Sequence, residues 1–231
     1  MPPVAVSDSA SAPGPGRPAS VPLASDGRVP GPRGLATRQR LIDTVGEMLD
    51  GTPYREIRVT DIARAAGTSP ATFYQYFIDV EEVVLTLAED TADIGARLSE
   101  LLEGRKWRGA AGWQSACELV DSFLDFWRQQ QPVLRVVDLL TEEGDARFRR
   151  ARVRMLNTVT VALAEVIAEG GAADDPSLEA MAMAGALVSM LAHVASHQSG
   201  FESWDIHVSD LREAMARLLY WGVTGPRVPA H

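Results

Sequence analysis

The sequence predicts an all-α protein of about nine helices, with a small helical domain near the N-terminus and a larger one behind it. Three observations support this fold class. Apolar residues recur at helical spacing in successive segments from residue 37 onward. No segment shows the period-two alternation of a half-buried strand. Glycines such as Gly104 and Gly144 interrupt the helical pattern and mark expected helix ends.

The first expected helix begins at Thr37, as its cap, and ends at the breaker sequence of residues 50–53. Two short helices follow at residues 59–66 and 70–76, and a long one begins at Asp79. The remaining helices are expected at residues 112–131, 132–143, 145–169, 176–199 and 208–221. Residues 1–36 are rich in Pro, Gly, Ser and Ala and are expected to form a disordered arm, and residues 226–231 form a tail.

Composition and charge bear on three questions: whether the chain can bind nucleic acid, whether it holds a disulfide or metal cluster, and whether it contacts a membrane. The net charge is −9, but residues 1–80 carry eight arginines and eight acidic residues, so the excess of acid lies entirely in residues 81–231. The N-terminal third therefore remains able to meet a polyanion. The single cysteine, Cys117, excludes an internal disulfide and a thiolate metal cluster. Because residues 180–192 are too short and interrupted to span a bilayer and no secretory signal is found, we expect a cytoplasmic protein without membrane contact.

Residues 59–77 have the pattern of a helix, a turn and a second helix. Gly67 provides the positive φ that ends the first helix, and Ser69 is placed to cap the second, with Pro70 in its first turn. Phe73 and Phe77 lie four residues apart and are expected to face the core. The second helix then turns its remaining residues to solvent, where they suit contacts with phosphates and base edges: Ala71, Thr72, Tyr74, Gln75 and Tyr76.

This segment resembles the helix-turn-helix of the TetR family of repressors. The matching residues are Ile62, Ala63, Ala66, Gly67, Ser69, Thr72, Tyr74, Tyr76 and Phe77, and the resemblance extends over residues 37–87. It implies a DNA-binding domain at residues 37–80 in which Tyr74 and Tyr76 hold the DNA backbone and Thr60 and Gln75 face base edges. The full set expected at DNA is Arg38, Arg58, Thr60, Ser69, Ala71, Thr72, Tyr74, Gln75 and Tyr76.

Two positions depart from the family pattern. Val80 stands where a phosphate-binding lysine is usual, so binding is expected to be less salt-dependent by about one unit of slope. Arg58 replaces the small hydroxyl residue that usually caps the first helix of the motif, and its charge offers a replacement phosphate contact. Arg38 belongs to a basic cluster with Arg28, Arg33 and Arg40 that either follows DNA or forms a solvated linker. The alternative to the whole assignment is an ordinary helical hairpin whose aromatic residues belong to the core.

The resemblance also implies that residues 81–225 form a ligand-binding and dimerisation domain. The helix at residues 180–195 is almost entirely apolar with small residues, as expected for a dimer face. The residues expected at that interface are Gly185, Ser189, Leu211, Met215 and Leu218. Packing inside one chain is the alternative.

Aromatic residues and methionines of this domain are candidates for the wall of an apolar ligand site. They are Trp113, Cys117, Phe123, Phe126, Trp127, Met155, Val159, Met183 and Leu187, each of which is otherwise plain core. Five arginines within residues 147–154 form a basic run in an acidic domain. They either bind the phosphates of an acyl-CoA or another acidic ligand, or form a solvated face paired with nearby acidic residues.

The expected function is therefore a DNA-binding transcriptional regulator, a homodimeric repressor released from a palindromic double-stranded operator by a small apolar ligand. His193 and His197 lie one helical turn apart, so a metal-responsive or ligand-independent regulator is the alternative. No cofactor is expected. No nucleophile elbow, phosphate-binding glycine loop or set of catalytic residues at a recognisable spacing is present, which argues against an enzyme.

Overall fold

The computed structural model describes residues 31–170 and 176–225. Within these ranges the chain forms nine α-helices, two short 3₁₀ helices and no strand, which confirms the predicted fold class. The elements are α1 (Pro32–Gly51), η1 (Tyr54–Glu56), α2 (Val59–Ala65), α3 (Pro70–Tyr76), α4 (Val80–Ala96), η2 (Arg97–Leu101), α5 (Gly109–Glu142), α6 (Ala146–Gly170), α7 (Pro176–Ser196), α8 (Gln198–Glu202) and α9 (Val208–Thr224). Most of the expected arm and all of the expected tail lie outside the described residues.

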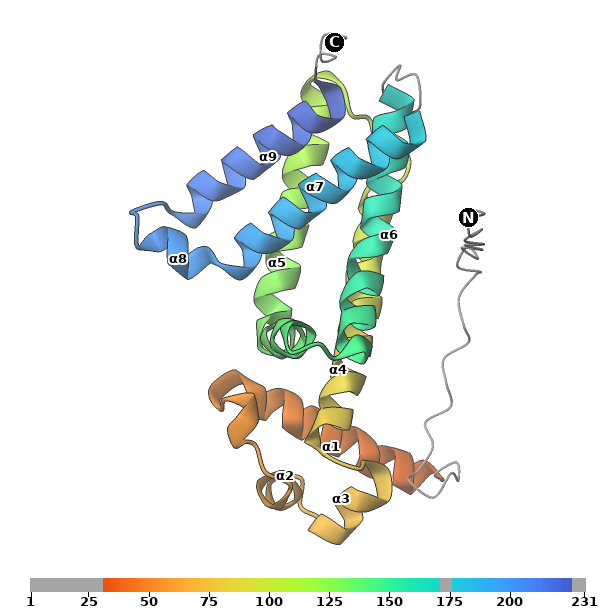
Figure 1. Ribbon diagram of the computed structural model, residues 1–231, viewed down its shortest axis with the longest axis vertical. Coiled ribbons are helices and arrows are strands. Elements are labelled where there is room, and N and C mark those ends of the chain that lie inside the picture. Colours follow the sequence, from red (N-terminus) through yellow and green to blue (C-terminus); the bar gives the residue numbers. More distant parts are fainter. Residues whose placement is uncertain (1–30, 171–175, 226–231) are drawn as a thin grey trace, which may run out of the picture.

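The N-terminal helices form a head beneath the longer helices of the body, and α4 passes from one into the other (Figure 1). The head core contains Leu41 of α1, Ile62 of α2 and Phe73 of α3, all fully buried. The same cluster includes Val137 of α5 and Phe148 of α6. The head and the lower ends of α5 and α6 therefore share one hydrophobic core.

The body has its own core, built from α4 with η2, α5, α6, α7 and α9. In it α4 packs along α6, α6 packs along α7, and α9 lies against α5. Gly222 of α9 approaches Leu187 of α7 so closely that an added Cβ would lie 2.7 Å from the leucine Cδ1. Helix α4, which leaves the head, thus packs against α5 and α6 of the body.

Three predicted helix boundaries are wrong. The helix expected at residues 176–199 ends at Ser196 and is followed by the short α8, which was not predicted. The first helix starts at Pro32 rather than Thr37, because Gly31 is extended and proline is favourable in a first turn; the Thr37 hydroxyl donates instead to the Arg33 carbonyl oxygen at 3.0 Å. The predicted break at Gln131 and Pro132 is also absent, and α5 runs through it.

The continuity of α5 has a tertiary cause. Pro132 removes one backbone donor, but Val133 and Leu134 directly after it are buried and hold the following turns in place. Figure 1 shows the C-terminal part of α5 running in a different direction from the first part, as expected for a proline kink. This kink brings the end of α5 under the body and onto the head.

Helix α7 is the only helix in the described ranges that is long and apolar enough to cross a membrane, over Glu179–Ser196 with a mean hydropathy of 1.3. A core helix passes the same test by composition. The buried residues of α7 pack against α5, α6 and α9, so its apolar character is accounted for in part by the body core.

Candidate functional site

The turn between α2 and α3 has the predicted local chemistry. Gly67 has a φ of +65°. The Ser69 hydroxyl accepts a hydrogen bond from the Thr72 backbone N–H at 3.2 Å, which caps α3. Phe73 and Phe77 are completely buried. These contacts fix α3 on the head with one face turned outward.

The outward face of α3 carries most of the residues that were predicted to meet DNA. Ala71, Tyr74 and Gln75 are exposed, and so are Arg58 and Thr60 at the start of α2. Thr72 is half-buried, and its hydroxyl lies 3.0 Å from that of Ser69. Tyr76 is also half-buried and packs against the head core, contrary to the prediction that it points to solvent. The two tyrosines therefore lie in different environments.

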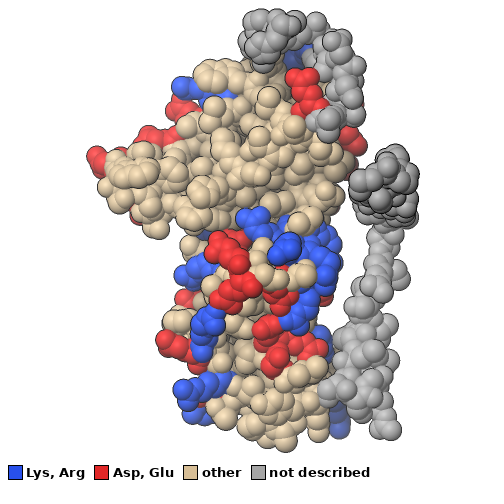
Figure 2. All heavy atoms as spheres, in the orientation of Figure 1, with Lys and Arg blue, Asp and Glu red and all other residues tan. Residues whose placement is uncertain are grey.

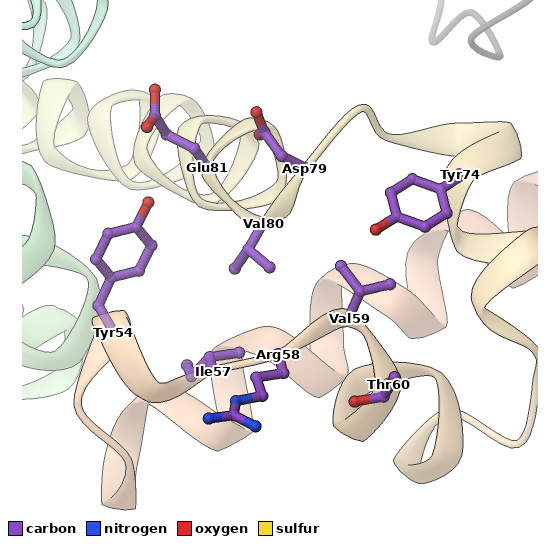
Figure 3. Close-up of a pocket in the computed structure, with 9 residues that line it drawn as sticks. All are labelled: Tyr54, Ile57, Arg58, Val59, Thr60, Tyr74, Asp79, Val80 and Glu81. Carbon is purple, nitrogen blue, oxygen red and sulfur yellow. The ribbon is translucent and has the colours of Figure 1, made fainter.

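A groove of about 630 Å³ separates the start of α2 from the start of α4. Figure 3 shows Arg58, Val59 and Thr60 on one side, with Tyr74 at one end and Tyr54 at the other. Val80, which replaces the lysine of the family pattern, points into this groove. Burial, together with Glu81 and Asp79, raises the pKa of Tyr54 to about 12, so this phenol stays neutral.

Arg38 is not fully extended into solvent. Its guanidinium carbon lies 4.8 Å from the centre of the Phe77 ring, and burial lowers its pKa from the ordinary arginine value. Its Nε is buried and has no partner among the described residues. Arg38 thus covers the core beside α3, a structural contact that the sequence did not indicate.

Ion pairs connect the head to the body at the corner between α5 and α6. Arg55 of η1 pairs with Glu143, and Arg147 of α6 pairs with both Glu81 of α4 and Asp145, the latter at 2.7 Å. Hydrogen bonds from Arg147 lower the pKa of Asp145 to about 2. The carboxylate of Asp145 is therefore charged throughout the physiological range, and the corner remains a charged link between the two parts.

Most of the predicted ligand residues meet in the body core. The rings of Phe123 and Trp127 stack with centres 4.8 Å apart, and Phe126 meets Trp127 edge-on at 5.3 Å. Trp127 Nε1 donates to Ser196 Oγ at 2.6 Å, a contact between α5 and α7 that the sequence did not reveal. Met155, Val159 and Leu187 belong to the same buried cluster, and Cys117 is packed at its edge.

Two predicted ligand residues lie outside this cluster. Trp113 is 36% exposed, and its ring packs edge-on against Tyr220 of α9. Met183 is 42% exposed on the outer side of α7. Of the three rings of the cluster, Trp127 alone lines a surface groove of about 260 Å³, together with Ser196 and His197. We refer to it as the Trp127 groove.

Gly95 joins the aromatic cluster to α4. A Cβ at this position would lie 2.5 Å from Met155 Cγ and 3.1 Å from Phe126 Cζ. The helix that emerges from the head therefore touches two of the predicted ligand residues directly. An isolated glycine inside a helical pattern was the available sequence signal, since such a residue often marks a close approach.

The outer side of α7 and α9 is apolar and uncharged over most of its area. On α7 it consists of Ala182, Ala186 and Ser189, and on α9 of Ala214, Leu218 and Trp221, all exposed. Figure 2 shows few charged atoms over this part of the surface, in contrast to the band of charges across the middle of the molecule.

The predicted dimer residues divide between this outer side and the interior. Ser189 and Leu218 are exposed, and a Cβ at Gly185 would meet no atom within 4 Å. Leu211 is half-buried. Met215 is only 3% exposed and lies in the core of the single chain, not on the surface where the sequence placed it. It supports α9 from behind rather than forming the outer face.

His193 of α7 and His197, which lies between α7 and α8, do not belong to a larger cluster of metal-ligating residues in the described ranges. Their rings stack with centres 4.2 Å apart, and the described ranges contain no group of three or more histidine, cysteine or acidic side chains placed to hold an ion. The metal-responsive alternative finds no support in this geometry.

Comparisons with known proteins identify the family. A family model for the tetracyclin repressor-like C-terminal domain matches residues 98–230, more than half of the chain. An uncharacterized HTH-type transcriptional regulator from Haemophilus influenzae is 27% identical over 132 residues, which are 57% of this chain and 63% of that protein. The chain thus spans less than two-thirds of the length of this curated relative.

Three solved structures show the same fold at low identity. A TetR-family regulator from Streptomyces coelicolor is 15% identical with a TM-score of 0.62, covering 80% of this chain and 79% of that one. FadR from Bacillus subtilis in complex with stearoyl-CoA is 17% identical with a TM-score of 0.56, covering 82% and 99%. FadR from Thermus thermophilus in complex with lauroyl-CoA is 19% identical with a TM-score of 0.54, covering 84% and 97%. Given the family match over more than half of its length and this shared fold, the chain belongs to the TetR family of transcriptional regulators.

Proposed function

We propose that this regulator is a homodimeric repressor that binds a palindromic operator through α2 and α3 and is released by a small apolar ligand held in the body. The observation that carries the proposal is the shared core of head and body. Phe73 and Phe77 of the DNA-facing element lie in one cluster with residues of α5 and α6. A rearrangement of the body helices therefore reaches α3 through packed side chains.

The outer side of α7 and α9 supports dimerisation. Single exposed apolar residues are common, but two adjacent helices with an outer side that is uncharged over most of its area indicate an interface. A twofold axis through this face would present two copies of α3 to half-sites related by the same symmetry. We expect the operator to be an inverted repeat. We also expect the protein to bind it in the cytoplasm.

The aromatic cluster supports an apolar ligand. Phe123, Phe126 and Trp127 are adaptable apolar walls next to the Trp127 groove, and Met155 links them to Gly95 of α4. Two proteins of the same fold are seen with acyl-CoA molecules. A ligand with an acyl chain is therefore the first class to test.

The direct test combines operator selection with ligand screening. Purified protein would select its binding site from random duplex DNA, and the selected site would then be titrated with the protein in the presence of each candidate compound. The proposal requires a site with inverted-repeat symmetry and at least one apolar compound that weakens its binding. A selected site without such symmetry would refute the dimeric arrangement.

A ligand-independent regulator is distinguished in the same experiment. If no compound that stabilises the protein changes operator affinity, the body serves assembly alone. The DNA-binding part of the proposal would then stand without the release step.

A further inference from the structure

A third groove, of about 450 Å³, lies where the end of α5 meets the first half of α6. We call it the α6 groove. The residues that matter in its lining are Thr141, Arg149, Arg152, Val153, Leu156 and Asn157. It shares no lining residue with the groove of Figure 3 or with the Trp127 groove.

The arginines of α6 differ from one another in pairing, and only Arg149 both lines the α6 groove and has no ion pair in the described ranges. On the same helix, Arg147 pairs with Asp145 and Glu81, and Arg154 pairs with Asp93. Arg149 is exposed and forms no ion pair within residues 31–170 and 176–225. Arg152 engages Asp138 through its Nε, at 2.6 Å, so this ion pair does not use the terminal nitrogens of its guanidinium.

The groove also contains an unsatisfied hydroxyl. Thr141 Oγ1 is buried and has no hydrogen-bond partner in the described part of the chain. Buried polar groups without partners are rare, because each one costs about 1–3 kcal/mol of lost hydration. With Arg149, Arg152 and the Asn157 amide, it makes a set of donors that lacks a matching free acidic acceptor in the lining.

The other part of the lining is apolar. Val153 is 59% exposed, and Leu156 is half-buried and packs against the body core. Donors beside an apolar surface suit a molecule with an anionic head and a hydrocarbon part, because phosphate and carboxylate oxygens only accept hydrogen bonds.

We propose that the α6 groove binds the anionic head, phosphate or carboxylate, of an amphipathic small molecule, with its first carbons on Val153 and Leu156. The inference rests on the proposed function, since it gives the releasing ligand an anionic head and places that head beside Leu156, which packs against the same body core as the aromatic cluster. Met155, adjacent to Leu156, contacts Gly95 of α4. Occupancy of the groove therefore acts on the helix that touches α4.

The test uses three ligands with the same chain: octanoate, octyl phosphate and octanol. Binding of each to the full chain is measured by calorimetry in the absence of DNA. At least one of the anions is expected to bind about tenfold more tightly than octanol, because one charge-assisted hydrogen bond contributes about that gain in affinity. Which anion binds more tightly distinguishes a carboxylate from a phosphate ligand.

Arg149→Ala is expected to weaken binding of that anion about tenfold and to leave octanol unchanged. Arg150→Ala is the matched control, because Arg150 is exposed on the same helix, has no ion pair in the described ranges and does not line the groove. Thr141→Val removes the unsatisfied hydroxyl, so it should weaken anion binding without lowering the melting temperature.

The proposal is overturned if neither anion binds more tightly than octanol, or if Arg149→Ala and Arg150→Ala have the same effect. An anion that binds as expected but leaves operator affinity unchanged would refute ligand release while supporting the site. The two proposals therefore fail in distinguishable ways.

Discussion

At the scale of single residues, two exposed residues of α3 are expected to make different contacts with DNA: Tyr74 adds to binding strength, and Gln75 to sequence preference. Tyr74 is 53% exposed, and its ring packs edge-on against Phe73 at 5.6 Å, so the core holds its position. Gln75 is exposed beside it. A phenol placed in this way suits a phosphate, whereas an amide suits the donor and acceptor edge of a base.

We expect Tyr74→Phe to weaken binding to every DNA sequence by about 1 kcal/mol, because it removes one hydroxyl and keeps the ring. Gln75→Ala should instead relax the preference at one base pair in each half-site, at about 1–3 kcal/mol. Titration of the selected operator and of its single-base variants measures both. Gln129→Ala, an exposed glutamine of α5, is the control, and equal effects of all three substitutions would contradict the assignment.

Gly95 is a second residue whose role follows from its surroundings. Gly95→Ala forces the new methyl group against Met155 and Phe126, so we expect a loss of stability of about 1–3 kcal/mol and a changed operator affinity, as α4 shifts relative to α6. Thermal unfolding and operator titration measure the two effects.

The control for Gly95 is Gly46→Ala in α1. A Cβ at Gly46 meets only Leu87 Cδ2, at 3.8 Å, which is an ordinary contact. This substitution should raise stability by up to about 1 kcal/mol, since alanine is the better helix former. If Gly95→Ala behaves like Gly46→Ala, α4 is not tightly held at that point.

At the scale of whole helices, α7 and α9 have two different faces. One face packs into the body core, where Met215 and Leu219 are buried. The other consists of small and apolar residues that remain exposed in a single chain. A helix pair of this kind is explained most simply by a second copy of the same pair.

Leu218→Asp tests this face. The side chain is 47% exposed in the single chain, so the substitution should leave the fold intact while placing a buried charge in the dimer. We expect a monomer by light scattering and a loss of tight operator binding, because one head holds too few contacts. Ile94→Asp, at 45% exposure on α4, is the matched control and should remain dimeric. A wild-type monomer would exclude the interface.

At the scale of the whole molecule, head and body are coupled through the shared core, through the ion pairs at the corner of α5 and α6, and through α4. A ligand shifts the balance between DNA-binding and released states only by its preference for one of them. A hundredfold preference provides about 2.7 kcal/mol for each site. Two sites in a dimer are sufficient for release.

We therefore expect an apolar compound that raises the melting temperature to weaken operator binding as well. Trp127→Phe should reduce the affinity for that compound, since it removes the bond to Ser196 and part of the stacked ring, while ligand-free operator binding stays nearly unchanged. Trp204→Phe, on a residue that is 71% exposed, serves as the control. If no stabilising compound affects operator binding, the aromatic cluster is only core.

The sequence by itself determined the all-α class and the DNA-facing motif. Helix caps and tight turns depend on residues that are adjacent in the chain, so Gly67, Ser69 and Pro70 could be interpreted without long-range information. The alternation of Phe73 and Phe77 with exposed neighbours follows from helical spacing alone.

Only the tertiary structure decided which side of each body helix faces inward. Met215 and Leu218 are equally apolar in sequence, yet the packing of α9 on α5 buries the first and exposes the second. In the sequence Pro132 predicts a helix break, but in the structure the buried residues after it hold α5 together. The sequence likewise does not tell which arginines of the basic run of α6 form ion pairs, since their acidic partners come from other helices. Burial and ion pairing depend on contacts between residues far apart in the chain.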